Sequence, residues 1–341
     1  MRECSEIDII GVPLDLGVRE LGLRLGPDAL RQVGLVEVGR RLGLDVRDLG
    51  NIEPPYANGF GEAHPRPALV SGAPSGGQAA SFDELSVAVT EREDVPHTKT
   101  IAAYCRKVAA TVAESVRTGR LPVCLGGDHS LAIGSVAGVA SEVGLVGCFW
   151  VDAHPDANTP KTSPSGNIHG MPVAIIAGEG PQELLRVGAR RPLVACRNLF
   201  LLGTRDIDPG ELAFIQEHDI GMYTVFDILE RGLPTAVDRG IERVTANTAG
   251  VHVSLDLDVL HEGIAPGVGI PSRCGLTMRE ATYVCRRLAS ECRITSVDVI
   301  GLNPVRDRGM GTAKRAAELL LALLGRSYSF TYEDYLRDQH T

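Results

Sequence analysis

The sequence predicts an α/β fold in which a mostly parallel central sheet lies between two layers of helices. Short, nearly continuous apolar runs are typical of strands that are buried on both faces. Longer stretches with helical spacing of apolar residues separate these runs, and several of them open on Ser, Thr or Pro. Because strand and helix alternate along most of the 341 residues, we expect one three-layer αβα domain spanning 1–341.

The expected elements follow from these runs. Strands are predicted at 7–12, 121–125, 147–151, 198–202, 251–255 and 294–300. Helices are predicted at 100–118, 131–143, 209–218, 277–290 and 312–324. Two segments depart from the alternation: an irregular insertion at about 54–97, rich in Pro, Gly, Ala and Ser, and a C-terminal tail at about 326–341. The insertion is either a substrate lid or a surface excursion, and the tail either frays or packs on a neighbouring subunit.

Composition restricts the class of partner. The net charge of −9 argues against nucleic acid, whose phosphates need clustered Lys and Arg. No stretch reaches the roughly 18 apolar residues of a membrane span, and the acidic N-terminal residues do not resemble a secretory signal. The eight cysteines are scattered and include no CxxC pair, so we expect reduced thiols and a cytoplasmic protein that acts on a small molecule.

Three clusters of carboxylate and histidine each follow a predicted strand. They are Leu-Gly-Gly-Asp-His-Ser (125–130), Trp-Val-Asp-Ala-His-Pro-Asp (150–156) and Ser-Leu-Asp-Leu-Asp (254–258). The carboxyl ends of parallel strands share one edge of a sheet, where ligands bind in such folds. Singly, each His could be a core or surface residue and each Asp a cap or turn residue. Together, the clusters predict one metal site.

The donor set indicates the kind of metal. Alternate residues of an extended chain project to the same side, so each cluster can offer several ligands at once. Four carboxylates and two imidazoles suit Mn²⁺ and related octahedral ions better than structural zinc. Two divalent cations would balance the negative charges of the expected ligands, which are His129, Asp152, His154, Asp156, Asp256 and Asp258.

Beyond these clusters, the chain resembles the arginase and agmatinase superfamily, the ureohydrolases. The matching motifs are the three clusters, with the second continuing to Pro160, and Ser-Gly-Asn-Ile-His-Gly-Met-Pro (165–172) and Arg-Asp-Ile-Asp-Pro-Gly (205–210). The segments 9–13 and 26–31 match the opening of the family. The likeness covers nearly the whole chain, apart from the insertion and the tail.

The resemblance implies a mechanism and a ligand set. One Mn²⁺ would be held by Asp152 and Asp256 with His129 and Asp156, and a second by the same two aspartates with His154 and Asp258. A metal-bridging hydroxide would attack the amidino carbon. Asp156 would also orient the nucleophile, and His169 would shuttle a proton to the leaving amine. Co, Ni or Fe could replace Mn, and the family likeness predicts a homo-oligomer, either a trimer or a hexamer.

The amino-acid end of the substrate also has matching positions. Asn158 and Ser165 match residues that bind an α-carboxylate, and Asp206 and Asp208 match the site near an α-amino group. The alternative is turn chemistry, since Asn-Thr-Pro, Pro-Ser-Gly and Asp-Pro-Gly all favour turns. The matches favour an arginine-like amino acid over agmatine, which has no carboxylate.

Two positions depart from the family pattern at the guanidinium end. Gly301 stands where the family has a glutamate that pairs with the guanidinium, and Ile270 replaces a threonine. A buried guanidinium without that partner would cost several kcal/mol. We therefore expect an amidinohydrolase that acts on a modified arginine, such as N-hydroxyarginine, and releases urea or a substituted urea. The alternatives are an ordinary arginase with a substitute carboxylate, for which Glu262 is the candidate, and a non-catalytic regulatory subunit.

Overall fold

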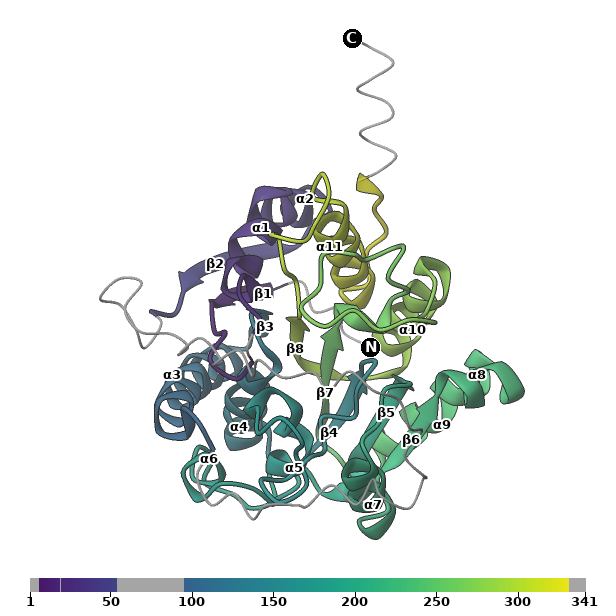
Figure 1. Cartoon of the computed structure of the whole chain (residues 1–341). Coiled ribbons are helices and arrows are strands. Elements are labelled where there is room, and N and C mark those ends of the chain that lie inside the picture. Colours follow the sequence, from purple (N-terminus) through teal and green to yellow (C-terminus); the bar gives the residue numbers. More distant parts are fainter. Residues whose placement is uncertain (1–5, 19, 54–94, 331–341) are drawn as a thin grey trace, which may run out of the picture.

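The computed structural model describes residues 6–18, 20–53 and 95–330. Its centre is one sheet of eight strands, all paired in parallel: β1 (Glu6–Val12), β2 (Asp45–Asn51), β3 (Leu121–Gly126), β4 (Val146–Val151), β5 (Leu199–Thr204), β6 (Gly221–Thr224), β7 (Gly250–Asp256) and β8 (Ile294–Ile300). The strands lie in the order β2-β1-β3-β8-β7-β4-β5-β6 (Figure 1). Strand β8, the last along the chain, therefore lies between β3 and β7.

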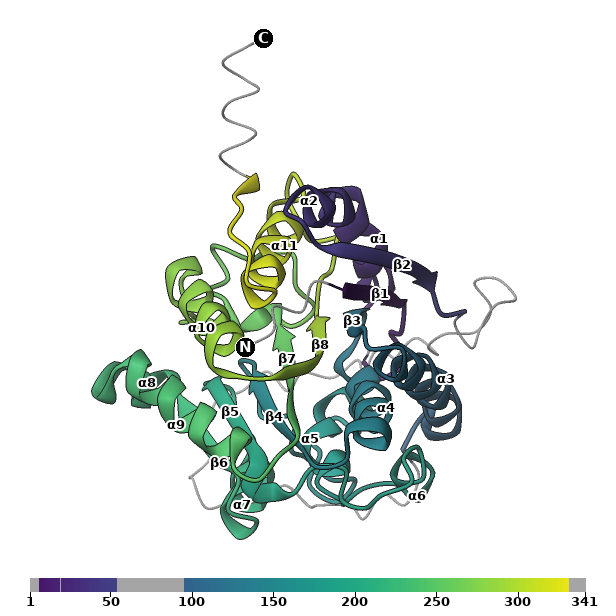
Figure 2. The same ribbon diagram turned by 180° about the vertical axis from the view of Figure 1, so that it is seen from behind.

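Helices cover both faces of the sheet. One face packs on α1 (Gly26–Gln32), α2 (Leu35–Arg41), α8 (Val225–Arg231), α9 (Leu233–Thr245), α10 (Met278–Glu291) and α11 (Gly311–Leu323). The other packs on α3 (Thr98–Arg117), α4 (Ala132–Val143), α5 (Pro172–Ile176), α6 (Gln182–Leu185) and α7 (Pro209–Glu217). The two groups lie on opposite sides of the sheet in Figures 1 and 2. The predicted three-layer α/β fold is confirmed.

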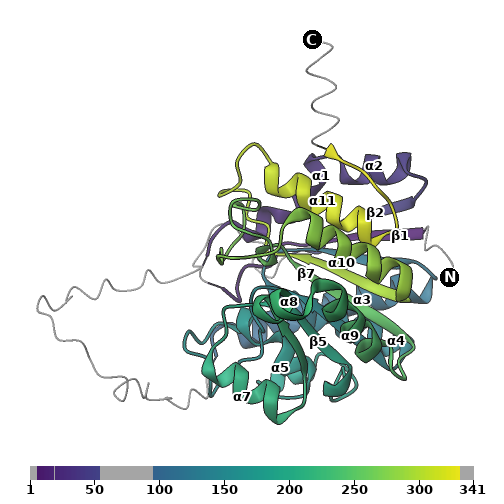
Figure 3. The same ribbon diagram turned by 90° about the vertical axis from the view of Figure 1, so that its right-hand side faces the viewer.

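The alternation of side chains along β1 shows how one strand serves two cores. Ile7 and Ile9 belong to the core under α1, α10 and α11, whereas Ile10 and Val12 belong to the core under α3 and α4. Such strands are apolar on both faces, which explains the continuous apolar runs in the sequence. Figure 3 shows the layers from the side, with α10 and α11 above β7 and α5 and α7 below it.

Two of the predicted helix starts, those of α7 and α10, are confirmed by capping boxes. Thr277 is the N-cap of α10, where its hydroxyl accepts from the backbone N–H of Glu280 and the Glu280 carboxylate accepts from the N–H of Thr277. Asp208 and Glu211 form the corresponding capping box at α7, where Pro209 is the first helical residue. The predicted helix and strand ends agree with the structure to within two residues.

Several elements were not expected from the sequence. Strands β2 and β6 form the two edges of the sheet, and most residues of β2 are exposed, so it lacks the apolar run used to find strands. The short helices α1, α2, α5, α6 and α8 and the longer helix α9 were also missed. The sheet is parallel throughout the described residues, where the sequence predicted one that is mostly parallel.

The two irregular segments are described only at their borders. Residues 54–94 and 331–341 lie outside the described residues, so a lid or a subunit contact there stays a prediction. At the start of the tail, Tyr328 accepts a hydrogen bond of 2.7 Å from Arg41, and the N–H of buried Phe330 donates to Glu318 at 2.7 Å. Within the described ranges, no helix has the length and apolar character needed to cross a membrane.

Candidate metal centre

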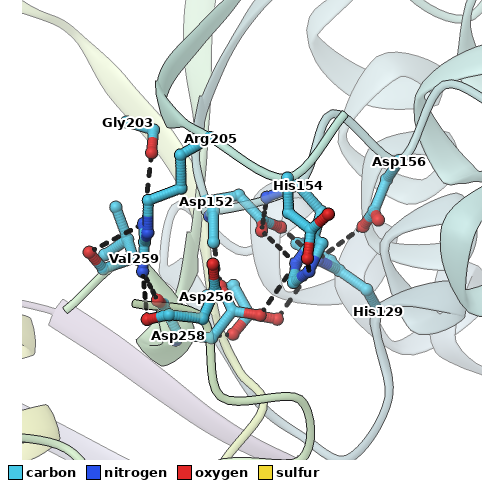
Figure 4. A network of polar contacts seen from close by, with 12 residues as sticks. His129, Asp152, His154, Asp156, Gly203, Arg205, Asp256, Asp258 and Val259 are labelled. Carbon is cyan, nitrogen blue, oxygen red and sulfur yellow. Dashed lines mark hydrogen bonds and ion pairs between the residues drawn. The ribbon is translucent and has the colours of Figure 1, made fainter. Parts of the chain in front are cut away.

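All six predicted metal ligands meet at the carboxyl ends of the central strands (Figure 4). His129 begins a 3-10 turn directly after β3, and the segment from Asp152 to Asp156 follows β4. Asp256 is the last residue of β7, and Asp258 lies in the 3-10 turn that continues it. Because β8 separates β3 from β7, Gly301, the residue that follows β8, lies in the middle of this group.

The first group of ligands surrounds His129. Its Nδ1 lies 3.0 Å from Asp152 Oδ2, 3.0 Å from Asp156 Oδ2 and 3.5 Å from Asp256 Oδ2. All four residues are buried. Asp156 has a left-handed backbone with φ of +51°, a conformation that Asp tolerates better than most residues and that turns its carboxylate back toward His129.

The second group surrounds His154. Its Nδ1 lies 3.0 Å from Asp258 Oδ2 and 3.5 Å from Asp152 Oδ1. Asp152 therefore directs one carboxylate oxygen to His129 and the other to His154. That is the arrangement expected of a residue that bridges two metal ions.

The residues present fit a pair of divalent cations. His129 Nδ1 and Asp156 Oδ2 are buried and lack a hydrogen-bond partner among the described residues. Buried polar atoms without partners are costly, and a cation between them would satisfy both. The trios His129–Asp152–Asp256 and Asp152–His154–Asp258 each bring ligand atoms within 4.8 Å of one another. The hard oxygen donors suit Mn²⁺ and ions like it.

The pKa shifts of these side chains also support a site for cations. Burial and the nearby Asp152 raise the pKa of Asp156 to about 6, and burial together with Asp258 raises the pKa of Asp256 well above its ordinary value. Burial alone would lower the pKa of His129, but Asp152 and Asp156 raise it well above its usual range. The cluster thus gathers protons to offset its negative charge, a role that divalent cations would take over.

Two residues orient the ligands from behind, and sequence reasoning assigned them no role. Ser254 Oγ lies 2.7 Å from His129 Nε2, which leaves Nδ1 directed at the carboxylates. Trp150 stacks on the His129 ring with centroids 4.0 Å apart, and its Nε1–H donates to Asp152 Oδ2 at 3.1 Å. Each lies two residues before an aspartate at a strand end, so its side chain projects to the same side of the sheet as that aspartate. This alternation could have identified both residues from the sequence.

His169 is held as a neutral ring beside this centre. The backbone N–H of His129 donates to His169 Nδ1 at 2.9 Å, so the neutral imidazole carries its proton on Nε2. Burial and the charge of His129 lower the pKa of His169 to about 3. The backbone N–H of His169 donates to the Gly17 carbonyl at 2.9 Å, which fixes the His169 backbone on the loop after β1.

The predicted substrate residues are only partly brought together. Asn158 Nδ2 donates to Asp208 Oδ2 at 2.9 Å, so these two residues lie side by side. Asp206 is exposed, and its Oδ2 lies 3.6 Å from His154 Nε2, which makes it a neighbour of a metal ligand. Ser165 is exposed, and its hydroxyl accepts from the N–H of Asn167, a turn contact.

Glu211 connects this substrate end to the metal centre and was missed. Its two carboxylate oxygens accept from the N–H groups of Ala157 and Asp208, at 3.0 and 2.9 Å. It therefore ties the segment that contains Asp156 and Asn158 to the start of α7. Burial raises its pKa to about 8. The Asp-x-x-Glu spacing of a capping box was the signal that could have found it.

Gly301 borders the metal centre directly. Its φ is +84°, and a Cβ at this position would lie 2.4 Å from Asp256 Oδ1. Its carbonyl accepts from the N–H of Gly269 at 3.0 Å, which brings half-buried Ile270 close to it. The two departures from the family pattern are thus neighbours in space, and the glycine lets the backbone approach Asp256, a predicted metal ligand.

Glu262, the candidate substitute carboxylate, lies in the segment that follows Asp258. Its side chain is 36% exposed, but its Oε2 is buried and has no hydrogen-bond partner among the described residues. The nearest ion-pair contact described for it is His261 Nδ1, at 3.6 Å. The carboxylate is therefore not committed to another strong partner.

Comparisons with known proteins identify the family of the chain. The model of the Arginase family matches residues 5–325. An arginase from Bacillus caldovelox is 39% identical over 319 residues, covering 94% of this chain and 98% of that protein, and one from Staphylococcus aureus is 36% identical over 326 residues, covering 95% and 99%. The solved structure of the Bacillus caldovelox arginase superposes with a TM-score of 0.81, at 38% identity and coverage of 95% and 99%. The chain belongs to the arginase family of hydrolases.

Proposed function

We propose that this protein is a two-metal amidinohydrolase that uses Mn²⁺ and hydrolyses a modified arginine, such as N-hydroxyarginine, in preference to arginine. The observation that carries the proposal is the pair of His and Asp groups that share Asp152, combined with Gly301 beside Asp256. The chemistry supplied by two bound divalent cations is activation of water and stabilisation of developing negative charge. The products are ornithine and urea or a substituted urea.

Side chains of the protein orient the water, assist proton transfer and bind the substrate. Asp156 accepts a hydrogen bond from the attacking water and orients it toward the amidino carbon. His169 assists transfer of a proton from the attacking water to the leaving amine. Its neutral ring donates a hydrogen bond from Nε2, because Nδ1 already accepts the N–H of His129. The joined Asn158 and Asp208 side chains bind the amino-acid end of the substrate, and Ser165 and Asp206 border the same end.

The substrate class follows from the guanidinium end. With Gly301 and Ile270, this end lacks the carboxylate and the hydroxyl of the family pattern. A full guanidinium buried there without a partner loses the charge-assisted pair that would offset its desolvation. An N-hydroxyguanidine is less basic and enters more readily as a neutral group. This difference in basicity favours the modified substrate.

Ordinary arginine hydrolysis is the second candidate, and two observations favour it. The curated relatives of similar length are named arginase. Two carboxylate oxygens, Glu262 Oε2 and Glu20 Oε2, are buried without hydrogen-bond partners among the described residues. Glu20 precedes Leu21, whose carbonyl accepts from the Asn303 side chain at 3.0 Å, two residues beyond Gly301. Either carboxylate could pair with a guanidinium.

A substrate comparison separates these candidates. The Mn²⁺-loaded protein is assayed with arginine, N-hydroxyarginine, agmatine and guanidinobutyrate, with ornithine and urea or hydroxyurea as the measured products. Higher kcat/KM for N-hydroxyarginine supports the proposal, and Asp258→Asn is the control that should lose turnover of every substrate. Higher kcat/KM for arginine supports the second candidate, and Glu20→Gln and Glu262→Gln then identify the pairing acid. No turnover with two metals bound would refute both and leave a regulatory subunit.

The family resemblance also supports two proposals that the monomer itself does not test. We propose a cytoplasmic homo-oligomer, either a trimer or a hexamer. Light scattering of the purified protein measures the mass, and a monomeric mass would contradict the proposal.

A further inference from the structure

Arg205 makes an unusual set of contacts directly behind the metal centre. It follows β5, and its guanidinium donates to the backbone carbonyls of Gly203, Asp258, Val259, Leu260, Ser272 and Arg273. The shortest bonds, both 2.6 Å, go to Asp258 and Arg273. Figure 4 shows Arg205 beside Asp258 and Val259, on the side away from His129.

Five of these six carbonyls, all except that of Gly203 in β5, lie at the two ends of one segment. Residues 259–273, here called the recognition segment, leave the metal ligand Asp258, carry Glu262 and Ile270, and return to Arg205. One guanidinium therefore fixes the distance between the start and the end of the segment. A lysine could not do so, because its single ammonium lacks the planar spread of donors.

A second arginine holds the middle of the recognition segment and does not reach the metal ligands. Arg306 Nη1 donates to the Gly269 carbonyl at 2.7 Å. The N–H of Asn303 donates to the Gly267 carbonyl at 2.8 Å, and the N–H of Gly269 donates to the Gly301 carbonyl at 3.0 Å. Of the two arginines, Arg306 holds the middle of the recognition segment, whereas Arg205 contacts both the segment and Asp258. Substituting each in turn therefore separates support of the segment from its connection to Asp258.

The half-buried guanidinium of Arg205 lies near the carboxylates of Asp258 and Asp152. Burial lowers the pKa of Arg205, whereas the charges of Asp258 and Asp152 oppose that shift. The Asp258 carboxylate faces His154 while its own carbonyl is bonded to Arg205, so the residue connects the two sides. A displacement of the Asp258 side chain is transmitted to a backbone that Arg205 also joins to Ser272 and Arg273.

We propose that Arg205 is a positioning residue that couples metal binding at the His154–Asp258 group to the conformation of the recognition segment. The role rests on the proposed function, because it takes Asp258 as a metal ligand and residues 259–273 as the substrate wall. Metal loading fixes Asp258, Arg205 carries that restraint to both ends of the segment, and Glu262 and Ile270 reach their binding positions only in the loaded protein.

Hydrogen exchange measured by mass spectrometry, with and without Mn²⁺, tests the coupling in the full-length protein. In the wild type, Mn²⁺ should slow amide exchange across residues 259–273. In Arg205→Ala and Arg205→Lys that slowing should disappear, and the second Mn²⁺ should bind about 10–100-fold more weakly, the range for groups that orient metal ligands. The matched control Arg306→Ala should speed exchange near Gly269 but keep both Mn²⁺ ions and the slowing at the ends of the segment.

Two results would overturn the coupling. One is an Arg205→Lys protein, folded by circular dichroism, that retains wild-type Mn²⁺ affinity and wild-type slowing of exchange. The other is an Arg306→Ala protein that loses Mn²⁺ affinity and the slowing of exchange as Arg205→Ala does. General loosening of the recognition segment would then explain the data. Failure of the proposed function is distinguishable, because it would show as absent turnover while Mn²⁺ still slows exchange in the wild type.

Discussion

Replacing Gly301 with alanine tests whether this glycine protects the metal centre. With φ at +84°, an alanine adopts a left-handed backbone that costs about 1–2 kcal/mol. Its Cβ would also lie 2.4 Å from Asp256 Oδ1 and 3.0 Å from the carboxylate carbon. Relieving such overpacking costs about 1–3 kcal/mol more. Because the crowded group is a predicted bridging ligand, we expect both a less stable protein and about 10–100-fold weaker Mn²⁺ binding.

Gly43→Ala is the matched control for the backbone term. Gly43 has φ of +83°, but a Cβ there would meet nothing within 4 Å. Urea denaturation in EDTA compares the two variants, and their difference in unfolding free energy isolates the contact with Asp256. Mn²⁺ content after dialysis and Mn²⁺ titration then measure the effect on the centre.

The reasoning fails if Gly301→Ala is as stable as Gly43→Ala and keeps two Mn²⁺ ions at wild-type affinity. Gly301→Glu extends the test, because a glutamate would restore the carboxylate of the family pattern but has the same Cβ. We expect it to lose metal before it gains activity on arginine. A Gly301→Glu protein with two Mn²⁺ ions and faster arginine hydrolysis would show that Asp256 adapts.

Three further predictions concern neighbouring groups. His169→Asn should lower kcat by about 10²–10⁴-fold with KM and Mn²⁺ content little changed, as measured by steady-state kinetics; unchanged kcat would exclude its proton role. Ser254→Ala should weaken Mn²⁺ binding by about 10–100-fold, whereas Ser296→Ala, whose hydroxyl lies 2.7 Å from His252 instead, should not. In EDTA, the folded protein holds extra protons on Asp156, at a pKa of about 6, and on His129, so its unfolding free energy should fall as pH rises from about 5 to about 8. Mn²⁺ displaces those protons, so its stabilising effect should grow over the same range, and urea denaturation with and without Mn²⁺ checks both signs.

The clustering of the six candidate metal ligands could be predicted because their signal is local. Each cluster follows an apolar run, and the carboxyl ends of parallel strands share an edge whatever the order of the strands. The spacing from Asp152 to Asp156 therefore sufficed without knowledge of which strands are neighbours. The role of His169 in the sequence was assigned only through family resemblance.

Other parts of the site depend on contacts that no local pattern reveals. Arg205 reaches carbonyls of residues 53 to 68 positions away, and backbone carbonyls carry no sequence signal. The crowding at Gly301 arises because β8 lies beside β7, which the sequence does not state. In contrast, α9 could have been found, because its buried residues Ala236, Val237, Gly240 and Val244 repeat at helical spacing.

The central place of β8 has a consequence for synthesis on the ribosome. Until its residues emerge, β3 and β7 each present an open edge in what becomes the middle of the sheet, and open edges pair readily with other chains. The residue that follows this strand is Gly301, which lies against Asp256. Sheet closure and the last wall of the metal centre are therefore completed together, late in translation. We therefore expect full metal affinity only in chains whose β8 has joined the sheet.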